Sequence, residues 1–219
     1  MLRRVFKSFW RDEKGITGLE TAIILIAFVV VAAVFAYTVL SAGLFTTQKS
    51  QEAVYSGLKE AQGSLELRGG VIATADTQGA SGNISQISFI VSNALGGEPM
   101  DFTAPTANTT SNNGLAASTS TNKVVISYVD KYQQVNDLFW QVSKLGNADA
   151  DDLLEANEKF KITIGGDTAG SGAGNLMDAL GTDLTTNKEF SVIVNTPVGA
   201  VLEIERTTPP YIDEIMNLH

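Results

Sequence analysis

The sequence predicts an α+β protein in which a long hydrophobic N-terminal helix is followed by a β-sandwich head. Three observations carry this prediction: an uncharged apolar run early in the chain, glycines near residue 70 that end the helical pattern, and β-branched segments beyond them. The chain has 219 residues, enough for one or two domains. The expected divisions are a basic segment at 1–15, a helix at 16–68 and a sandwich at 69–219.

The apolar run extends from Ala22 to Leu40 without a charged residue, and Tyr37 and Thr38 are its only polar side chains. A helix rises about 1.5 Å per residue, so this run spans roughly 30 Å, the thickness of a bilayer core. The preceding segment, 1–15, holds five basic residues against two acidic ones, a net charge of +3. This basic end is expected to stay on the cytoplasmic side of the membrane.

Three features distinguish this run from a secretion signal or a plain membrane anchor. A secretory signal ends at a small-residue cleavage site, whereas here the helical spacing of apolar residues continues as far as Leu65. Gly18 and Gly43 are small residues that let helices pack closely. Glu20 is ionisable at the edge of the run, where a charge is costly unless a partner neutralises it. An ordinary signal anchor is the alternative interpretation.

Three stretches carry a resemblance to a known family: KGITGLETAIILIAFVVVAAVFAY at 14–37, YSGLKEAQGSLELRGGVIA at 55–73 and GAVLEIERTTPPYIDEIMNLH at 199–219. Together they resemble archaellins, the archaeal flagellins, whose leader is of the type that type IV pilins carry. The resemblance is specific at both ends of the chain and covers the middle only in general character.

The resemblance implies how the N-terminus is processed and used. A membrane leader peptidase is expected to cut between Gly15 and Ile16, which places Gly18 and Glu20 at the third and fifth positions of the mature chain. Resemblance to pilins also implies that Glu20 of one subunit neutralises the ammonium of Ile16 of another during docking. The alternative is a glutamate that only marks the level of the lipid head groups at the rim of the run. The apolar run then waits in the membrane and is later buried among copies of itself.

Beyond residue 70 the pattern changes from helical spacing to short β-branched and aromatic segments. Glycine, asparagine, threonine and serine dominate the loops between them, which favours the short strands of an Ig-like β-sandwich. The predicted strands are ISQISFIV (84–91), KVVISYV (123–129), KFKITIG (159–165), FSVIVN (190–195) and AVLEIER (200–206). The stretch 103–122 is low in apolar bulk and is predicted to be an exposed loop.

Two sequons are candidate glycosylation sites. Asn108 begins Asn-Thr-Thr inside the polar stretch, where a glycan is easily accommodated. Asn83 begins Asn-Ile-Ser and stands at the start of a predicted strand, so it is the weaker candidate. The archaellin resemblance implies glycosylation, since members of that family are often glycoproteins.

The stretch LGNADADDLLEANEKFKI contains a candidate calcium site. Asn147, Asp149 and Asp151 alternate, and Glu158 stands twelfth if Asn147 is first, which is the oxygen-ligand spacing of an EF-hand loop. The sixth position is Asp152 instead of glycine, and no convincing pair of helices flanks the loop. The alternative is an acidic turn that leads into the next strand.

Composition argues against several other functions. There is no cysteine, so a disulfide scaffold and a thiol nucleophile are both excluded. A net charge of −9 repels phosphates, and nucleic acid is therefore not an expected partner. The only histidine is the last residue, His219, and the glycine-rich stretch 165–175 lacks the Lys-Ser/Thr pair of a phosphate loop. We therefore expect no enzyme activity and no cofactor apart from the calcium candidate.

The sequence thus predicts a subunit that polymerises with its own copies through the N-terminal helix. The expected product is an extracellular archaellum filament used for swimming, assembled from a membrane-inserted precursor. An adhesive type IV-like pilin is the nearest alternative, and the ending at 199–219 favours an archaellin over it. A membrane-anchored extracellular binding domain is a third interpretation, but no pocket motif supports it.

Overall fold

The computed structural model describes residues 13–94, 97–108, 110, 113–166 and 174–218. The chain forms two compact units, and the division falls between Tyr55 and Ser56. Helix α2 (Glu13–Gln62) makes up the described part of the first unit, and its last turns belong to the second. The second unit, residues 56–219, is called the head below and contains every strand that the structure describes.

Helix α2 confirms the long N-terminal helix but ends six residues before the boundary that the sequence predicts. Its last residue is Gln62, and the N–H of Gly63 donates to the carbonyl of Lys59 at 3.0 Å. A Cβ on Gly63 would lie 2.6 Å from the carbonyl oxygen of Val198, so a close backbone contact requires glycine here. The predicted boundary at residue 68 is wrong because Leu65 already belongs to a strand, and strand pairing overrides its helical spacing.

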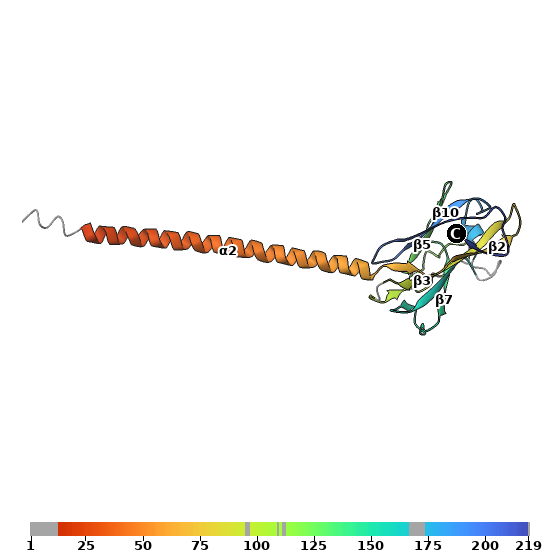
Figure 1. Ribbon diagram of the computed structural model, residues 1–219, viewed down its shortest axis with the longest axis horizontal. Coiled ribbons are helices and arrows are strands. Elements are labelled where there is room, and N and C mark those ends of the chain that lie inside the picture. The colour runs from red at the N-terminus through yellow and green to blue at the C-terminus, as the bar shows by residue number, and fades with distance from the viewer. Residues whose placement is uncertain (1–12, 95–96, 109, 111–112, 167–173, 219) are drawn as a thin grey trace, which may run out of the picture. The chain divides into compact units, whose positions relative to one another are not determined.

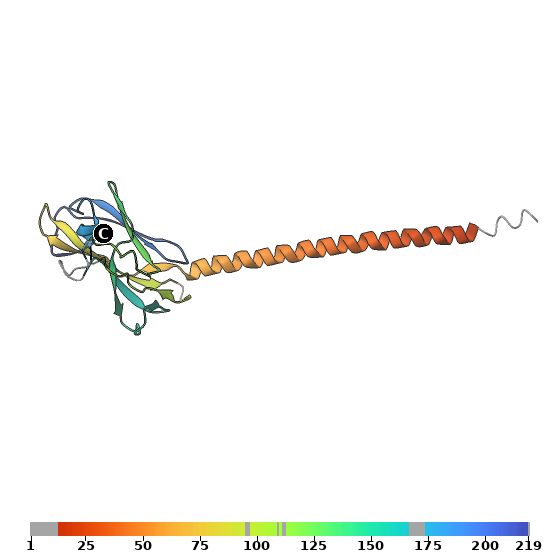
Figure 2. The same ribbon diagram turned by 180° about the vertical axis from the view of Figure 1, so that it is seen from behind.

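The strands of the head form two main sheets, which Figures 1 and 2 show from opposite sides. The first sheet has the order β12-β2-β3-β9-β7, with β1 also paired to β3; the second has the order β11-β10-β5-β6. A short additional pair joins β4 to β8, and all of these pairings are antiparallel. The bounds are β1 Leu65–Leu67, β2 Val71–Thr77, β3 Asn83–Asn93, β4 Met100–Asp101, β5 Val125–Asp130, β6 Gln134–Val135, β7 Trp140–Leu145, β8 Leu153–Leu154, β9 Lys159–Ile164, β10 Glu189–Asn195, β11 Leu202–Thr207 and β12 Ile215–Leu218.

Both sheets contribute to a single hydrophobic core, which makes the head a β-sandwich as predicted. Phe89 and Ile162 come from the first sheet and Val192 from the second, and each is at most 1% exposed. Phe102 packs edge-on against Trp140, with 6.1 Å between ring centroids. The core cluster contains residues from Leu65 to Leu218 and none from the first unit, so the head has a core of its own.

The five strands predicted from β-branched patterns are all present, as β3, β5, β9, β10 and β11. Four longer elements lie outside the predicted set: β2, β7, β12 and the one-turn helix α3 (Leu176–Ala179). Helix α3 begins with a capping box, in which Asn175 accepts from the N–H of Asp178 at 3.3 Å and the Asp178 carboxylate accepts from the N–H of Asn175 at 2.8 Å. This reciprocal pair satisfies donors that a short helix otherwise leaves open.

The polar stretch 103–122 is only partly the exposed loop that the sequence predicts. Ala116 is buried and forms an isolated bridge with Ala107, while Leu115 bridges to Leu138 and packs against the core. The Phe139 N–H donates to the Gly114 carbonyl at 2.8 Å. Backbone pairing therefore anchors the second half of this stretch to the head, which its low apolar content does not reveal.

Candidate functional site

The surface of α2 is exposed throughout residues 17–55, and it is almost entirely apolar between Ala22 and Phe45. Ile23, Ile24, Leu25 and Ile26 occupy four successive positions, and their exposed fractions are 59–68%. Successive helix residues are about 100° apart, so four in a row cover every side of the axis. A helix that is apolar all round belongs in a membrane or inside a larger core. Helix α2 is long and apolar enough for the first of these.

Hydroxyl groups on this helix are already paired with its own backbone. Thr21 donates to the Thr17 carbonyl at 2.9 Å, Thr38 to that of Phe35 at 2.8 Å and Thr46 to that of Ala42 at 2.8 Å. Burying an unpaired hydroxyl costs free energy, whereas a hydroxyl bonded within its own helix needs no other partner. The helix can therefore enter lipid or a dry protein core without losing these hydrogen bonds.

The space beside three glycines of α2 is unoccupied. A Cβ added to Gly18, Gly43 or Gly57 would meet nothing within 4 Å. Such positions allow the backbone of a second helix to approach closely, which is how helices associate where apolar burial alone gives little.

The predicted leader junction lies at the start of the described helix. Residues 13–16, which include Gly15 and Ile16, already have helical backbone, and their side chains lie outside the described residues. Glu20 is exposed on the helix surface. Cleavage after Gly15 and pairing of Glu20 with an ammonium group both stay predictions.

The acidic loop predicted to bind calcium is held by hydrogen bonds to its own backbone. Glu158 is buried, and its Oε1 and Oε2 accept from the N–H groups of Asp149 (3.0 Å) and Glu155 (2.9 Å). Asp149 accepts from the Asp151 N–H at 2.9 Å, and Asn147 is exposed at the start of the loop. Among the residues that the structure describes, no three acidic or histidine side chains converge as a metal centre requires. Calcium binding stays a prediction, and the observed geometry is that of a capped turn.

The two sequon asparagines differ in their surroundings. Asn83 begins β3, its Oδ1 accepts from the Thr77 N–H at 3.1 Å, and its Nδ2 donates to Asp183 at 3.2 Å. A glycan on Asn83 would disturb this pairing at the sheet end. Asn108 is half-buried, and its N–H donates to the Leu115 carbonyl at 3.3 Å. Thr109 of its sequon lies outside the described residues, so glycosylation stays a prediction at both sites.

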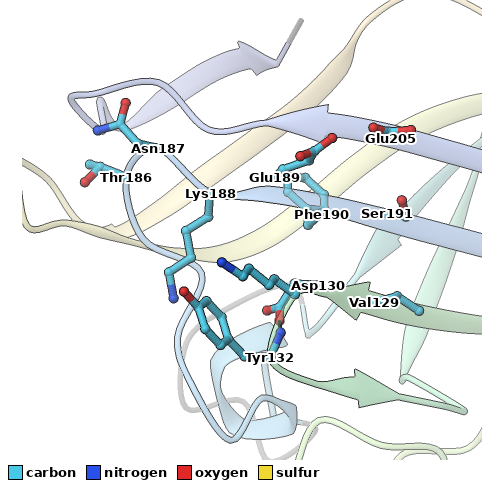
Figure 3. Close-up of a pocket in the computed structure, with 11 residues that line it drawn as sticks. Val129, Asp130, Tyr132, Thr186, Asn187, Lys188, Glu189, Phe190, Ser191 and Glu205 are labelled. Carbon is cyan, nitrogen blue, oxygen red and sulfur yellow. Dashed lines mark hydrogen bonds between the residues drawn. The ribbon is translucent and has the colours of Figure 1, made fainter.

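A hollow of about 710 Å³ opens on the head where β5 ends and β10 begins. Tyr132 is 68% exposed there, and the Nζ atoms of Lys131 and Lys188 lie 5.6 and 5.3 Å from its ring centroid. Figure 3 shows Tyr132 and Lys188 together at one end of the hollow, with Glu189 and Glu205 on neighbouring strands at the other. A hydrogen bond between the two carboxyl groups and their mutual repulsion raise the pKa of Glu205.

The turn beside the hollow is fixed by Asp130. Its carboxylate accepts hydrogen bonds from the N–H groups of Tyr132 (2.6 Å) and Gln133 (2.9 Å) and from the hydroxyl of Tyr128 (2.9 Å). Burial pushes the pKa of Asp130 up, but these hydrogen bonds outweigh burial and hold that pKa below its usual value. The Gln133 side chain then donates to the Thr182 carbonyl at 2.6 Å, which ties the turn to the segment after α3.

Comparison with known proteins decides the family. The model of the archaeal-type flagellin family matches residues 15–206. Probable flagellin 2 of Archaeoglobus fulgidus is 41% identical over 208 residues, covering 91% of this chain and 92% of its own length. Probable flagellin 1 of the same organism is 38% identical over 213 residues, covering 96% and 97%. The chain belongs to the archaeal-type flagellin family.

A solved structure agrees with this assignment. This flagellin is similar to a chain from the archaeal flagellum of Methanospirillum hungatei, with a TM-score of 0.52 and 28% identity over 92% of this chain and 98% of that one. Two predictions are therefore confirmed: the resemblance to archaellins, and a fold in which a long helix is followed by antiparallel sheets. The family consists of structural filament subunits, so neither the adhesive pilin nor the anchored binding domain is favoured.

Sequence patterns did not reveal the hollow of this flagellin. Lys131, Lys188 and Glu205 belong to three segments that are distant in the sequence, and no local motif joins them. The one available signal was a pair of lysines, each next to an acidic residue, in Asp130-Lys131 and Lys188-Glu189.

Proposed function

We propose that this flagellin is the structural subunit that polymerises into an archaeal flagellar filament and thereby serves swimming motility. The observation that carries the proposal is the uncovered apolar surface of α2, which is exposed on every side between Ala22 and Phe45. Membership of the flagellin family supports the proposal that copies of this chain cover one another's helices in a filament. The helices then form the filament core and the heads its outer layer.

Before assembly the same helix holds the precursor in the membrane. The apolar run supports insertion because it spans a bilayer, and the basic leader supports a cytoplasmic N-terminus. A membrane leader peptidase removes residues 1–15, and the mature chain begins at Ile16. Removal of the charged leader leaves an apolar N-terminus that is able to enter a filament core.

Substitutions within the helix test the proposal. Ala33→Lys places an ammonium group in the middle of the apolar run, where a charge costs about 2.5–3.5 kcal/mol even in a membrane. We expect no filaments from cells that produce this variant, while Ala33→Val, the matched control, assembles normally. Electron microscopy of material sheared from the cells gives the readout, and swimming in soft agar tests motility. Normal filaments from Ala33→Lys would contradict a helical core.

The separation of roles is tested by truncation. A fragment of residues 56–219 retains the whole hydrophobic core and lacks most of α2. We expect it to be soluble, folded and monomeric, as measured by circular dichroism and light scattering. Filaments formed by the fragment alone would show that the heads, and not the helices, drive polymerisation.

A further inference from the structure

The hollow combines two pairs of like charges that have no ionic partner. Lys131 and Lys188 share the ring of Tyr132, and neither forms a salt bridge to any residue that the structure describes. Glu189 and Glu205 adjoin each other at the other end and likewise form none among the described residues. A partner with an acidic end and a basic end would neutralise both pairs. The term bipolar hollow is used below for these five residues.

The same head carries a segment with the matching charges on its other sheet. Lys159 and Lys161 are exposed on β9, while Phe160 and Ile162 between and beyond them are buried. The two lysines therefore point away from the core on the same side of the first sheet. The loop that precedes β9 contains exposed acidic side chains, and one of them, Glu155, lies four residues before Lys159. This segment, residues 155–161, is called the β9 segment.

One head cannot join its own two surfaces. Glu189 and Glu205 are exposed where Phe190 and Ile204 are buried, so they face outward from the second sheet. Lys159 and Lys161 of the β9 segment face outward from the first sheet, and the shared core lies between the two sheets. Any contact between these surfaces must therefore join two copies of the chain.

We propose that the bipolar hollow of one head binds the β9 segment of a second copy, with Lys159 and Lys161 against Glu189 and Glu205. Glu155 of the second copy then approaches the Lys131 end of the hollow. A contact between two different surfaces is heterologous, and its repetition gives rings where the rotation closes and open helical assemblies, as in a filament, where it does not. The proposal rests on the proposed function, since it requires that copies assemble.

Charge exchange tests this contact in whole filaments. One double variant is Glu189→Lys with Glu205→Lys, a second is Lys159→Glu with Lys161→Glu, and the quadruple variant combines them. Among the described residues, these four side chains form no salt bridge, and the hydrogen bond between Glu189 and Glu205 lies within the altered pair, so we expect each variant to fold. The neutral pair Glu189→Gln with Glu205→Gln is a milder variant if a reversal disturbs folding. Fluorescence of Trp140, the one tryptophan after residue 15, checks that the head core is intact.

The expected result separates specific docking from general repulsion. Filaments sheared from cells are incubated at low salt, and the ratio of released to sedimenting subunit is measured. We expect each double variant to raise this ratio about fivefold, because it replaces two exposed ion pairs at each contact with like charges. The quadruple variant should return to within about twofold of the natural chain, and all differences should shrink at high salt.

The first double variant decides between the two explanations. It moves the net charge of the proposed mature chain, residues 16–219, from −12 toward zero, so repulsion alone predicts stronger filaments, whereas docking predicts weaker ones. Equal or greater stability of this variant, or a quadruple variant no better than the doubles, would overturn the docking proposal while the filament function stands. Absence of filaments from the unaltered chain would instead overturn the proposed function.

Discussion

Replacement of Asp130 by alanine is expected to destabilise the head more than other substitutions at its surface. The Tyr128 side chain is 0% exposed, and its hydroxyl would lose the carboxylate that accepts its hydrogen bond at 2.9 Å. An unpaired buried hydroxyl costs about 1–3 kcal/mol. The N–H groups of Tyr132 and Gln133 would lose a charged acceptor as well, but water reaches the turn and offsets part of that loss.

The total effect is about 3 kcal/mol, which corresponds to a fall of roughly 6–12 °C in the melting temperature of a domain of this size. Unfolding of the 56–219 fragment in urea, followed by the fluorescence of its only tryptophan, Trp140, gives the measurement. In the Asp130→Ala background, Tyr128→Phe should cost almost nothing, because the unpaired hydroxyl has been removed. In the natural background the same change should cost about 1 kcal/mol.

The pH dependence supplies an independent test of this network. Because the pKa of Asp130 is lower in the folded head than in the unfolded chain, its stabilising effect is present above about pH 4. That effect is lost as the pH falls through the folded value, so the difference between the natural head and Asp130→Asn should shrink in acid. A loss below 0.5 kcal/mol for Asp130→Ala at neutral pH, or a constant difference down to pH 2, would refute this reasoning.

Three further predictions concern the leader, the rim of the helix and the acidic loop. Gly15→Val should leave the precursor uncut, since a side chain there blocks close approach of the peptidase; intact mass would show residues 1–15 retained. Glu20→Gln should be processed normally yet give few filaments by electron microscopy, and an unchanged filament yield would count against charge pairing at this position. If Asn147, Asp149, Asp151 and Glu158 bind calcium, a chelator should lower the melting temperature of the head, because binding to the folded state adds stability. An unchanged melting temperature would favour a plain acidic turn held by the backbone hydrogen bonds of Glu158.

The strands that the sequence predicted correctly are segments rich in β-branched and aromatic residues. Burial alternates along β9, β10 and β11, whereas β3 and β5 contain consecutive buried residues. In β10 the residues Phe190, Val192 and Val194 are buried and their neighbours are not, and the pattern is visible from the residues alone. Strand β7 was missed because its sequence, WQVSKL, contains only one β-branched residue, Val142, among polar residues. Its place in the sheet comes from pairing with β9, which is a property of the whole fold.

The candidate sites likewise divide into those with a local sequence signal and those that depend on the whole fold. The assembly helix was predictable because its signal is local, a long uncharged run together with a motif at its start. The calcium hypothesis used an equally local spacing, but the structure directs both oxygens of Glu158 to backbone N–H groups, which spacing alone cannot reveal. The bipolar hollow depends on contacts among β5, β10 and β11, and only the register of those strands brings its residues together.

The character of the helix explains why a filament of this subunit needs specific contacts elsewhere. Lipid is about as apolar as the side chains between Ala22 and Leu40, so moving the helix from membrane to filament gains little from hydrophobic burial. Close packing at small residues such as Gly18 supplies attraction. However, a surface that is apolar on every side does not select one rotation or one axial position, because polar groups are what specify register in helix packing. Under the two proposals above, Glu20 and the bipolar hollow are the charged features that would penalise wrong alignments. We therefore expect packing to provide the strength of the filament and these polar contacts to fix the arrangement of its subunits.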